Sequence, residues 1–325
     1  MTYLIEKQNN NIFLEKNILY IESIDRDIKK WPNSNEFEIF TPQKYDNVVS
    51  IKILNIQLPT FYFNISEKLQ NNKICISNST VSKIITLEDG FYNNKKMEIS
   101  LTNLLKQNID PSFNVKYNEL NNKFYFGHED KSFNLIFDTT NMNIDLTYSN
   151  CFNRIFDQHS FWGLGYYLGF DKKNYYASNN YNSYDVSFVW DICGEWINGS
   201  NTHLIKSPNC SIISNKENIY LEIDKYNSCD ELIPYTNQYF TNVNNGKINS
   251  CIVKIPTTVF YGENNSRTNY GYYEPLESGL EFKEPINNVS KLKFKFRQHN
   301  NMLVDFLNQN ISLTLEITKL KSTFK

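Results

Sequence analysis

Long apolar runs are missing from this 325-residue chain. Nowhere do about 18 apolar residues follow one another, which argues against a membrane-spanning helix. The opening residues, MTYLIEKQNNNIFLEKN, contain no continuous apolar core of the kind found in a signal peptide. The net charge is −2 and the pI is about 6.1. The chain as a whole therefore offers no cationic field for nucleic acid, although a local basic patch is compatible with these values.

Closely spaced cysteines are also missing. None of the six cysteines belongs to a C-x-x-C pair, and a chain of this length does not need disulfide staples. We therefore favour buried free thiols in a reducing cytosol over a zinc site or a disulfide framework. The six residues are Cys75, Cys151, Cys193, Cys210, Cys229 and Cys251.

Catalytic signatures are absent too: there is no G-x-S-x-G elbow, phosphate loop or kinase phrase. The Gly163–Gly169 segment has the spacing G-x-G-x-x-x-G, one residue too long for a dinucleotide loop, and we interpret it as a turn with packed aromatics. His128-Glu129-Asp130 and Asp157-Gln158-His159 each offer two metal ligands without the helical spacing of a zinc protease. We interpret these as surface loop residues. We expect no enzyme, no cofactor and no metal.

What the sequence does contain is apolar and polar residues alternating with period two. Lys291–Arg297 and Ile311–Thr318 alternate most cleanly, as half-buried antiparallel strands require. In Val48–Leu58 the apolar positions change phase, which predicts a β-bulge near Ile53–Leu54. The other predicted strands are Ile18–Ser23, Glu36–Phe40, Lys73–Ser77, Lys83–Leu87, Phe113–Asn118, Lys123–Gly127, Ser132–Asp138, Val186–Trp190, Ile219–Ile223 and Cys251–Ile255.

One helix is predicted, over Lys95–Gln107, because Met97, Leu101, Leu104 and Leu105 recur at helical spacing. The chain is 40% hydrophobic and 15% aromatic, which is ample for packed cores. Its length exceeds the roughly 250–300 residues at which a single core stops growing.

We therefore predict a mostly β protein with two antiparallel β-sandwich domains and one short helix in the first. The aperiodic segment 171–185 is the best candidate for a linker between them. The expected division is an N-terminal arm over 1–16, a first domain over 17–172 and a second domain over 173–325.

An ordered motif opens the first domain. Its residues are Asp25, Arg26, Asp27, Trp31, Pro32, Asn33, Ser34, Asn35, Phe37, Asn47, Val48, Ser50, Ile51, Pro59, Phe61, Tyr62, Asn72 and Ile74. In order and spacing they resemble the opening segment of the minor capsid proteins of nucleocytoplasmic large DNA viruses, the giant viruses. The sequence departs from that pattern at Ile24, where Ser is common, and at Trp31, where Tyr is common. Leu168-Gly169-Phe170 is similar to the phrase that ends the family's first half.

The resemblance implies jelly-roll topology and a structural role in the virion, with assembly in the host cytoplasm. The implied partners are the major capsid protein and other minor capsid proteins. The implied interface or motif residues are Asp25, Arg26, Asp27, Trp31, Pro32, Asn33, Phe37 and Pro59. The sequence leaves the oligomeric state open. The alternative function is a glycan- or receptor-binding β-sandwich at the particle surface, and a third is a hydrolase with dispersed catalytic residues.

Three features allow more than one interpretation. The Asp25-Arg26-Asp27 loop is a catalytic pair, an interface anchor or a self-paired turn in which Arg26 bridges carboxylates and loop carbonyls; we favour the turn. A basic stripe is formed by Lys291, Lys293, Lys295 and Arg297. It is either a docking surface for an acidic neighbour or nucleic acid, or a protection of the sheet against aggregation; we favour the protection. The Tyr-rich loops 175–184 and 261–273 suit protein interfaces and glycans equally.

Overall fold

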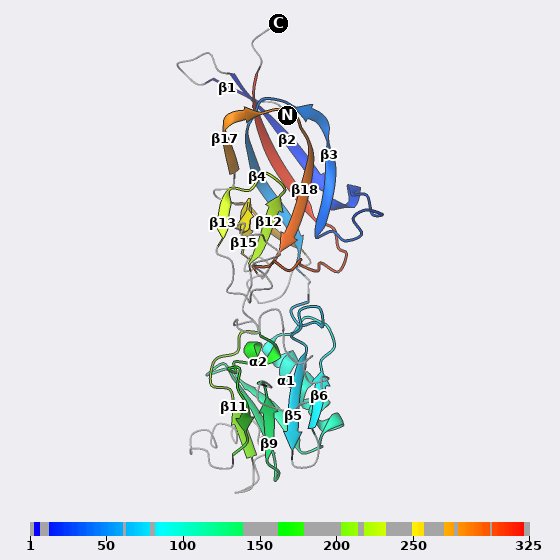
Figure 1. Cartoon of the computed structure of the whole chain (residues 1–325), viewed down its shortest axis with the longest axis vertical. Helices are drawn as coiled ribbons and strands as arrows, with labels where there is room; N and C mark the ends of the chain where they lie inside the picture. Colours follow the sequence, from blue (N-terminus) through cyan, green and yellow to red (C-terminus); the bar gives the residue numbers. More distant parts are fainter. Residues whose placement is uncertain are drawn as a thin grey trace. The chain divides into compact units, whose positions relative to one another are not determined.

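The chain forms two compact units, and the first is built from both ends of the sequence (Figure 1). The structure is a computed structural model that describes residues 3–6, 13–60, 63–78, 82–138, 162–178, 203–213, 218–231, 249–256, 270–275, 279–299 and 301–321. The terminal unit comprises 1–62, 216–234 and 244–325, and the inserted unit comprises 63–215 and 235–243. This division differs from the boundary at 172/173 expected from the sequence.

The terminal unit is an antiparallel β-sandwich. Its first sheet has the order β1 (Tyr3–Glu6), β2 (Phe13–Glu22), β19 (Ser312–Leu320), β4 (Val48–Pro59) and β16 (Tyr270–Tyr273), with β17 (Gly279–Ile286) also paired to β4. The second has the order β15 (Val253–Ile255), β12 (Ile219–Ile223), β18 (Val289–Arg297) and β3 (Glu36–Tyr45). A two-stranded sheet joins β13 (Cys229–Glu231) to β14 (Asn249–Cys251). Apolar side chains of both larger sheets form one core cluster.

Strand β19 explains why the terminal unit is discontinuous in sequence. It pairs with β2 on one side and β4 on the other, so the last strand of the chain completes a sheet begun by the first strands. Period-two alternation identifies such a strand but does not identify its partners. The arm expected over 1–16 also contains strand structure, because β1 pairs with the first residues of β2.

The bulge predicted in β4 is confirmed. Thr314 of β19 lies opposite Asn55, and the next residue, Leu315, lies opposite Ile53, so Leu54 is the extra residue. Leu54 is exposed, and the extra residue restores the inward direction of the side chains on both sides of it. Both halves of the strand consequently contribute to the core.

The inserted unit is also mostly β. One sheet has the order β10 (Tyr175–Tyr176), β9 (Phe133–Ile136), β5 (Lys73–Asn78) and β6 (Ser82–Thr86). The other has the order β11 (His203–Lys206), β8 (Lys123–His128) and β7 (Phe113–Asn118). The four strands predicted over Lys73–Ser77, Lys83–Leu87, Phe113–Asn118 and Lys123–Gly127 are present, and they pair as the antiparallel neighbours β5–β6 and β7–β8. The predicted strand Val186–Trp190 lies outside the described residues.

The predicted helix is confirmed as α1 (Asn94–Asn108). The Asn93 side chain accepts a hydrogen bond from the Lys96 backbone N–H and caps the helix. Met97, Leu101 and Leu105 are buried in the core of the inserted unit, as their spacing predicts.

The glycine-rich segment forms a tight aromatic turn around the short helix α2 (Leu164–Tyr167). A Cβ atom placed on Gly165 would overlap the rings of Trp162 and Phe137, so glycine is required there by close packing. Gly169 has a φ of +87°, which favours glycine as well. The interpretation as a turn with packed aromatics is therefore confirmed.

None of the four cysteines that the structure describes forms a disulfide. Cys75 and Cys251 are buried, as expected, whereas Cys210 and Cys229 are exposed. The expectation of burial was wrong for the exposed pair. Cys151 and Cys193 lie outside the described residues.

Replacing Gly165 with alanine should lower the free energy of unfolding by about 2 kcal/mol, because the added methyl group overpacks two fixed rings. Gly90→Ala is the matched control in the same unit, since the nearest atom to its added Cβ is 3.4 Å away. Urea denaturation of both variants measures the difference. Equal stabilities of the two variants would contradict the packing argument.

Candidate functional site

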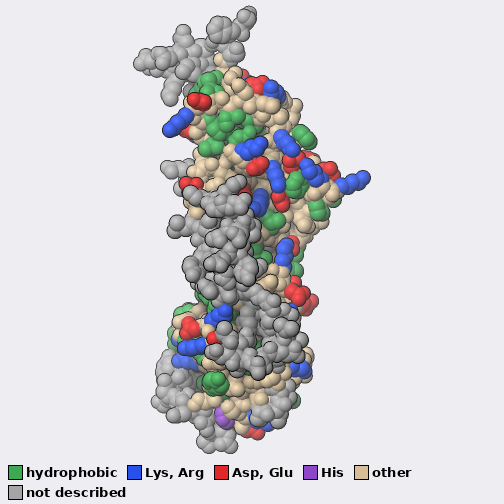
Figure 2. Space-filling view, in the orientation of Figure 1, with side chains coloured by type: hydrophobic (Ala, Val, Ile, Leu, Met, Phe, Trp, Pro, Cys, Tyr) green, Lys and Arg blue, Asp and Glu red, His purple; other side chains and the backbone are tan. Residues whose placement is uncertain are grey.

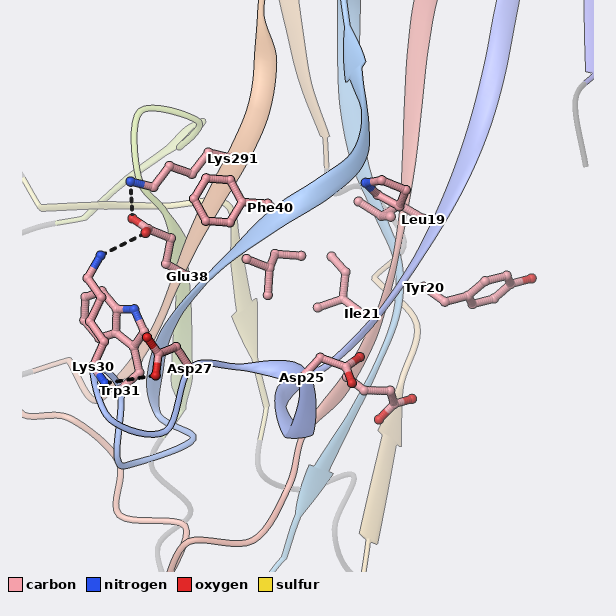
Figure 3. Close-up of a pocket in the computed structure, with 13 residues that line it drawn as sticks. Leu19, Tyr20, Ile21, Asp25, Asp27, Lys30, Trp31, Glu38, Phe40 and Lys291 are labelled. Atoms are coloured by element: carbon pink, nitrogen blue, oxygen red, sulfur yellow. Dashed lines mark hydrogen bonds and ion pairs between the residues drawn. The ribbon is translucent and has the colours of Figure 1, made fainter.

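A groove of about 620 Å³ opens on the terminal unit between β2 and β3 (Figure 3). Strand β3 is the outermost strand of its sheet. Strand β2 pairs with β1 only up to Lys16, and after Lys16 it pairs with β19 alone among the described residues. The groove is therefore the open side of the sandwich. Leu19 and Ile21 from β2 and Ile39 from β3 supply its apolar lining.

Arg26 braces the loop beside this groove. Its guanidinium donates to the backbone carbonyls of Ser23 at 2.7 Å, Trp31 at 3.0 Å and Pro32 at 3.1 Å. It also donates to the Oδ1 atoms of Asn308 at 2.9 Å and Asn310 at 3.4 Å. Arg26 is buried, and its planar set of donors suits five acceptors in one neighbourhood.

The neighbouring contacts attach the same loop to the C-terminal part of the chain. Ser23 Oγ accepts from the Ile311 backbone N–H at 2.8 Å, and Asn35 Nδ2 donates to the Val304 carbonyl at 2.8 Å. Residues 23–35 and 304–311 thus form one hydrogen-bonded assembly. The expectation of a self-paired turn was right in one respect, because Arg26 donates hydrogen bonds to backbone carbonyls of its own loop. It was wrong for the carboxylates, since the acceptors of Arg26 among the described residues are carbonyl and amide oxygens.

Three of the predicted site residues, Asp25, Asp27 and Trp31, line the groove. Asp25 is exposed in a short 3-10 turn, Ser23–Asp25. The Asp27 carboxylate accepts from the backbone N–H groups of Lys29 at 3.0 Å and Lys30 at 3.4 Å, which fixes the turn. The structure therefore brings this half of the motif together at one site.

The other predicted residues do not line the groove. The Pro32 ring and Asn33 are exposed, although the Pro32 carbonyl holds Arg26. Phe37 is fully buried, with its ring 5.3 Å from that of Phe294 in the core. Pro59 lies at the end of β4, opposite Tyr270. These residues shape the fold that presents the groove.

A charged clasp closes the β3 side of the groove. Glu38 accepts from Lys30 Nζ at 3.1 Å and pairs with Lys291 Nζ at 2.8 Å (Figure 3). The hydrogen bond from Lys291, assisted by the one from Lys30, lowers the pKa of Glu38. Glu38 is therefore held ionised, which does not suit a general acid at neutral pH.

Exposed apolar side chains gather around the groove. Tyr20 and Phe40 line it and are each 78% exposed, while Ile24 and Ile28 in the adjoining loop are exposed by 61% and 62%. Figure 2 shows hydrophobic side chains interspersed with both signs of charge over the terminal unit. Sequence reasoning missed Tyr20 and Phe40, because alternation marks them as outward-facing without showing that two edge strands bring them to one opening.

The basic stripe of β18 is part of a charge ladder. Lys291 pairs with Glu38, and Lys293 pairs with Glu36 at 2.6 Å across the β18–β3 register. Strand β18 is an inner strand, so its lysines do not shield a sheet edge, contrary to the favoured interpretation. Cross-strand neutralisation is the observed role of these residues.

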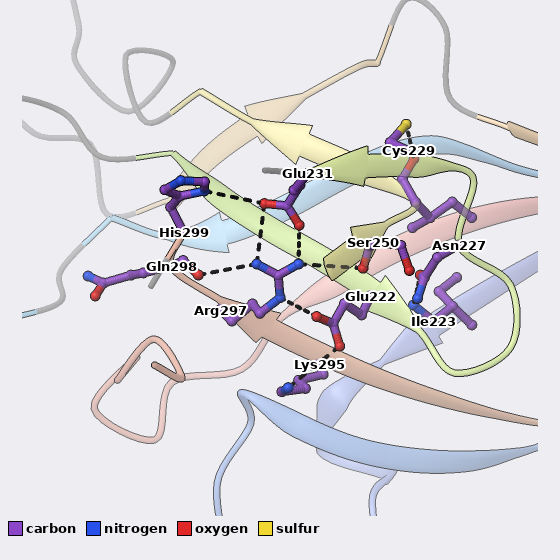
Figure 4. Close-up of polar contacts among 11 residues, drawn as sticks. Glu222, Ile223, Asn227, Cys229, Glu231, Ser250, Lys295, Arg297, Gln298 and His299 are labelled. Atoms are coloured by element: carbon purple, nitrogen blue, oxygen red, sulfur yellow. Dashed lines mark hydrogen bonds and ion pairs between the residues drawn. The ribbon is translucent and has the colours of Figure 1, made fainter. Parts of the chain in front are cut away.

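Arg297, the last member of the stripe, is fully buried rather than outward-facing. Figure 4 shows its polar contacts. It donates to the carboxylates of Glu222 and Glu231, and to the backbone carbonyl of Ser250 at 3.4 Å. Burial opposes its charge, but the hydrogen bonds to Glu231 and Glu222 prevail and raise the pKa of Arg297. A buried charge held by two carboxylates indicates a structural tie between β18, β12 and β13.

The candidate metal ligands at 128–130 are arranged differently from expectation. His128 is buried, not a surface loop residue, and its Nδ1 accepts from the backbone N–H groups of Asp130 and Lys131 at 3.2 and 3.0 Å. Its Nε2 lies 3.4 Å from Asp110 Oδ1. Within the described part of the chain, no group of three or more His, Cys, Asp or Glu residues is placed to hold a metal ion. Asp157 and His159 lie outside it.

Comparisons with known proteins show a likeness to solved structures. No family model and no curated protein match this chain. Among solved structures, the chain is similar to the mavirus penton protein, with a TM-score of 0.38 and 11% sequence identity over 93% of this chain and 99% of that chain. A likeness of this size does not assign the chain to a family. Among the described residues, no helix is long and apolar enough to cross a membrane.

Replacing Arg26 with lysine should lower the free energy of unfolding by about 2 kcal/mol, because one ammonium cannot satisfy acceptors arranged around a guanidinium. Lys29→Ala, a change at an exposed position of the same loop, should alter stability by less than about 0.5 kcal/mol. Urea unfolding followed by circular dichroism gives both values. An Arg26→Lys variant as stable as the control would show that the brace does not stabilise the fold.

Asp110 provides a pH-dependent test. The hydrogen bond from Lys131 Nζ, at 2.6 Å, together with the Ser112 backbone N–H lowers the pKa of Asp110 to about 2. Because this lies below the unfolded value of about 3.9, the stabilisation is present above that pH and is lost as the pH falls toward 2. Asp110→Asn should therefore cost about 1 kcal/mol at pH 7, and the difference from wild type should narrow between about pH 5 and pH 3.

Urea melts of the wild-type and Asp110→Asn proteins across that pH range measure the effect. Glu119→Gln, at an exposed position of the same unit, is the control for removing one negative charge. A pH-independent difference between wild type and Asp110→Asn would contradict the assignment.

Proposed function

We propose that this chain is a virion structural protein, a minor capsid component that binds neighbouring capsid proteins and stabilises the shell. The observation that carries the proposal is the ordered motif from Asp25 to Phe37. Those residues resemble the minor capsid proteins of giant viruses. In the structure Asp25, Asp27 and Trp31 line the groove, and Arg26 braces the loop beside it. The proposed location is the virion, with assembly in the host cytoplasm.

The surface around the groove supports an adhesive role. Tyr20 and Phe40 present large apolar areas at the opening of a sandwich edge, and aromatic side chains are enriched in protein interfaces. The carboxylates of Asp25 and Asp27 add a polar rim beside them. A neighbouring protein that inserts an apolar side chain and places a cationic group at this rim would be complementary to both features.

We further propose that the chain has no enzymatic activity of its own. The groove carboxylate with a shifted pKa, Glu38, is held ionised between two lysines, so it does not suit the role of a general acid, which has to be protonated at the working pH. The groove does favour one second candidate. Trp31 and Tyr20 beside Asp25 and Asp27 give the aromatic and carboxylate combination that also suits a glycan.

Quantitative mass spectrometry of particles purified from infected cells that express this chain tests the proposal. We expect the chain at a fixed ratio to the major capsid protein, and its absence from particles would refute a virion role. The double change Tyr20→Ser and Phe40→Ser should reduce incorporation by about tenfold or more, since both aromatic contacts are lost.

Leu120→Ser is the matched control, because Leu120 is 79% exposed and belongs to the inserted unit. Both variants should keep wild-type melting temperatures. Incorporation that falls equally in the two variants would exclude the groove as the contact. A glycan array that binds the wild type and not the double variant would favour the alternative function.

A further inference from the structure

Cys229 and Cys251 occupy directly opposite positions in an antiparallel strand pair. Cys229 begins β13 and Cys251 ends β14, and the register of these strands places the two residues opposite each other. Opposite residues in antiparallel strands have Cα atoms roughly 4.5–5.5 Å apart, which is within the range that a disulfide bridges. Their side chains belong to the same face of the ladder.

We propose that Cys229 and Cys251 are a redox-active pair that forms an intramolecular disulfide with a small disulfide oxidant such as oxidised glutathione. The other two described cysteines lack this arrangement. Cys75 lies opposite Ile84 and Ile136, and Cys210 lies outside the strands. The proposal is independent of whether the chain belongs to a virion.

The surroundings assign different roles to the two thiols. Cys229 is exposed, and its Sγ lies 3.9 Å from the carbonyl of Ile252, the residue that follows Cys251. Cys251 is 1% exposed. Burial, together with the charges of Glu231 and Cys229, raises the pKa of Cys251 to about 12. Cys229 is therefore the thiol that an oxidant reaches first.

The reaction balances with glutathione disulfide as the electron acceptor. The Cys229 thiolate attacks one sulfur of the oxidant, which forms a mixed disulfide and releases one glutathione as a thiol. Cys251 Sγ then loses its proton to water and attacks Cys229 Sγ, which forms the protein disulfide and releases the second glutathione. Two electrons and two protons pass from the cysteine pair to the two glutathione molecules.

The bond would hold Glu231 against Arg297. Glu231 ends β13, two residues after Cys229, and its carboxylate is one of two that pair with buried Arg297 (Figure 4). A two-stranded sheet of this length is marginal by itself. If β13 separated from β14, Arg297 would lose Glu231 and keep Glu222 as its remaining carboxylate partner. A disulfide between the two strands would oppose that separation.

The test uses the folded, full-length chain. It is incubated without denaturant in oxidised glutathione, remaining thiols are blocked with N-ethylmaleimide, and the protein is digested and analysed by mass spectrometry without reduction. We expect a peptide pair linked through Cys229 and Cys251, lost on treatment with a reductant. Thermal melting should show the oxidised protein several degrees more stable than the reduced protein.

Two serine variants provide the controls. Cys229→Ser, a change at an exposed position, should fold normally and melt at the same temperature under both conditions. Cys210→Ser changes the other described cysteine that is exposed. This variant should still form the Cys229–Cys251 cross-link and show the same rise in melting temperature on oxidation as the wild type. The proposal is overturned if Cys251 is alkylated while Cys229 carries glutathione, or if both thiols are alkylated after oxidation.

Discussion

The buried guanidinium of Arg26 is one of the places where the N-terminal and C-terminal parts of this chain are joined. Its acceptors come from residues 23–32 and from 308–310. A single side chain therefore connects the loop that follows β2 to the turn that precedes β19. Strand β19 then leaves that turn and pairs with β2 and β4. An arginine suits this position because its donors diverge in one plane toward several carbonyls, which a lysine cannot reproduce. The motif that resembles capsid proteins is thus largely a motif for closing the terminal unit.

Charge in the terminal unit follows burial. Lys291 and Lys293 are partly solvated and pair diagonally with acidic residues of β3, each two positions from the residue directly opposite, an arrangement that contributes about 1 kcal/mol or less per pair. Arg297 lies four residues after Lys293 on the same strand and is not accessible to water. Its buried charge is compensated by the carboxylates of both Glu222 and Glu231. Loss of one carboxylate there would leave a buried charge half compensated, which costs several kcal/mol. The same stripe of the sequence therefore contains residues of small and large energetic consequence.

The sequence predicts local structure well because alternation, helical spacing and turn residues are local signals. The bulge at Leu54 is an example: a change of phase within one strand was enough to position it. The partners of β19, the burial of Arg297 and the exposure of Cys229 were not predictable in this way. Each depends on residues that are distant in sequence. Period-two alternation predicts which face of a strand is buried, but it does not predict which strand pairs with it. The division into a terminal and an inserted unit was missed for the same reason.

The groove lies on the side of the sandwich that is bordered by β2 and by β3, the outermost strand of its sheet. Natural sheets commonly cover or charge their outer strands, because unpaired backbone groups invite association. Here β3 carries Glu38 within a lysine clasp, which adds charge to one side, whereas β2 offers Leu19 and Ile21 with Tyr20 beside them. The opening is therefore asymmetric: the lysine clasp lies on the β3 wall beside Ile39 and Phe40, whereas Leu19 and Ile21 line the β2 wall. A partner bound there would have a single favourable orientation, since reversing it would place an apolar group against the clasp and a charge against Leu19 and Ile21. That asymmetry favours a specific neighbour over indiscriminate strand addition.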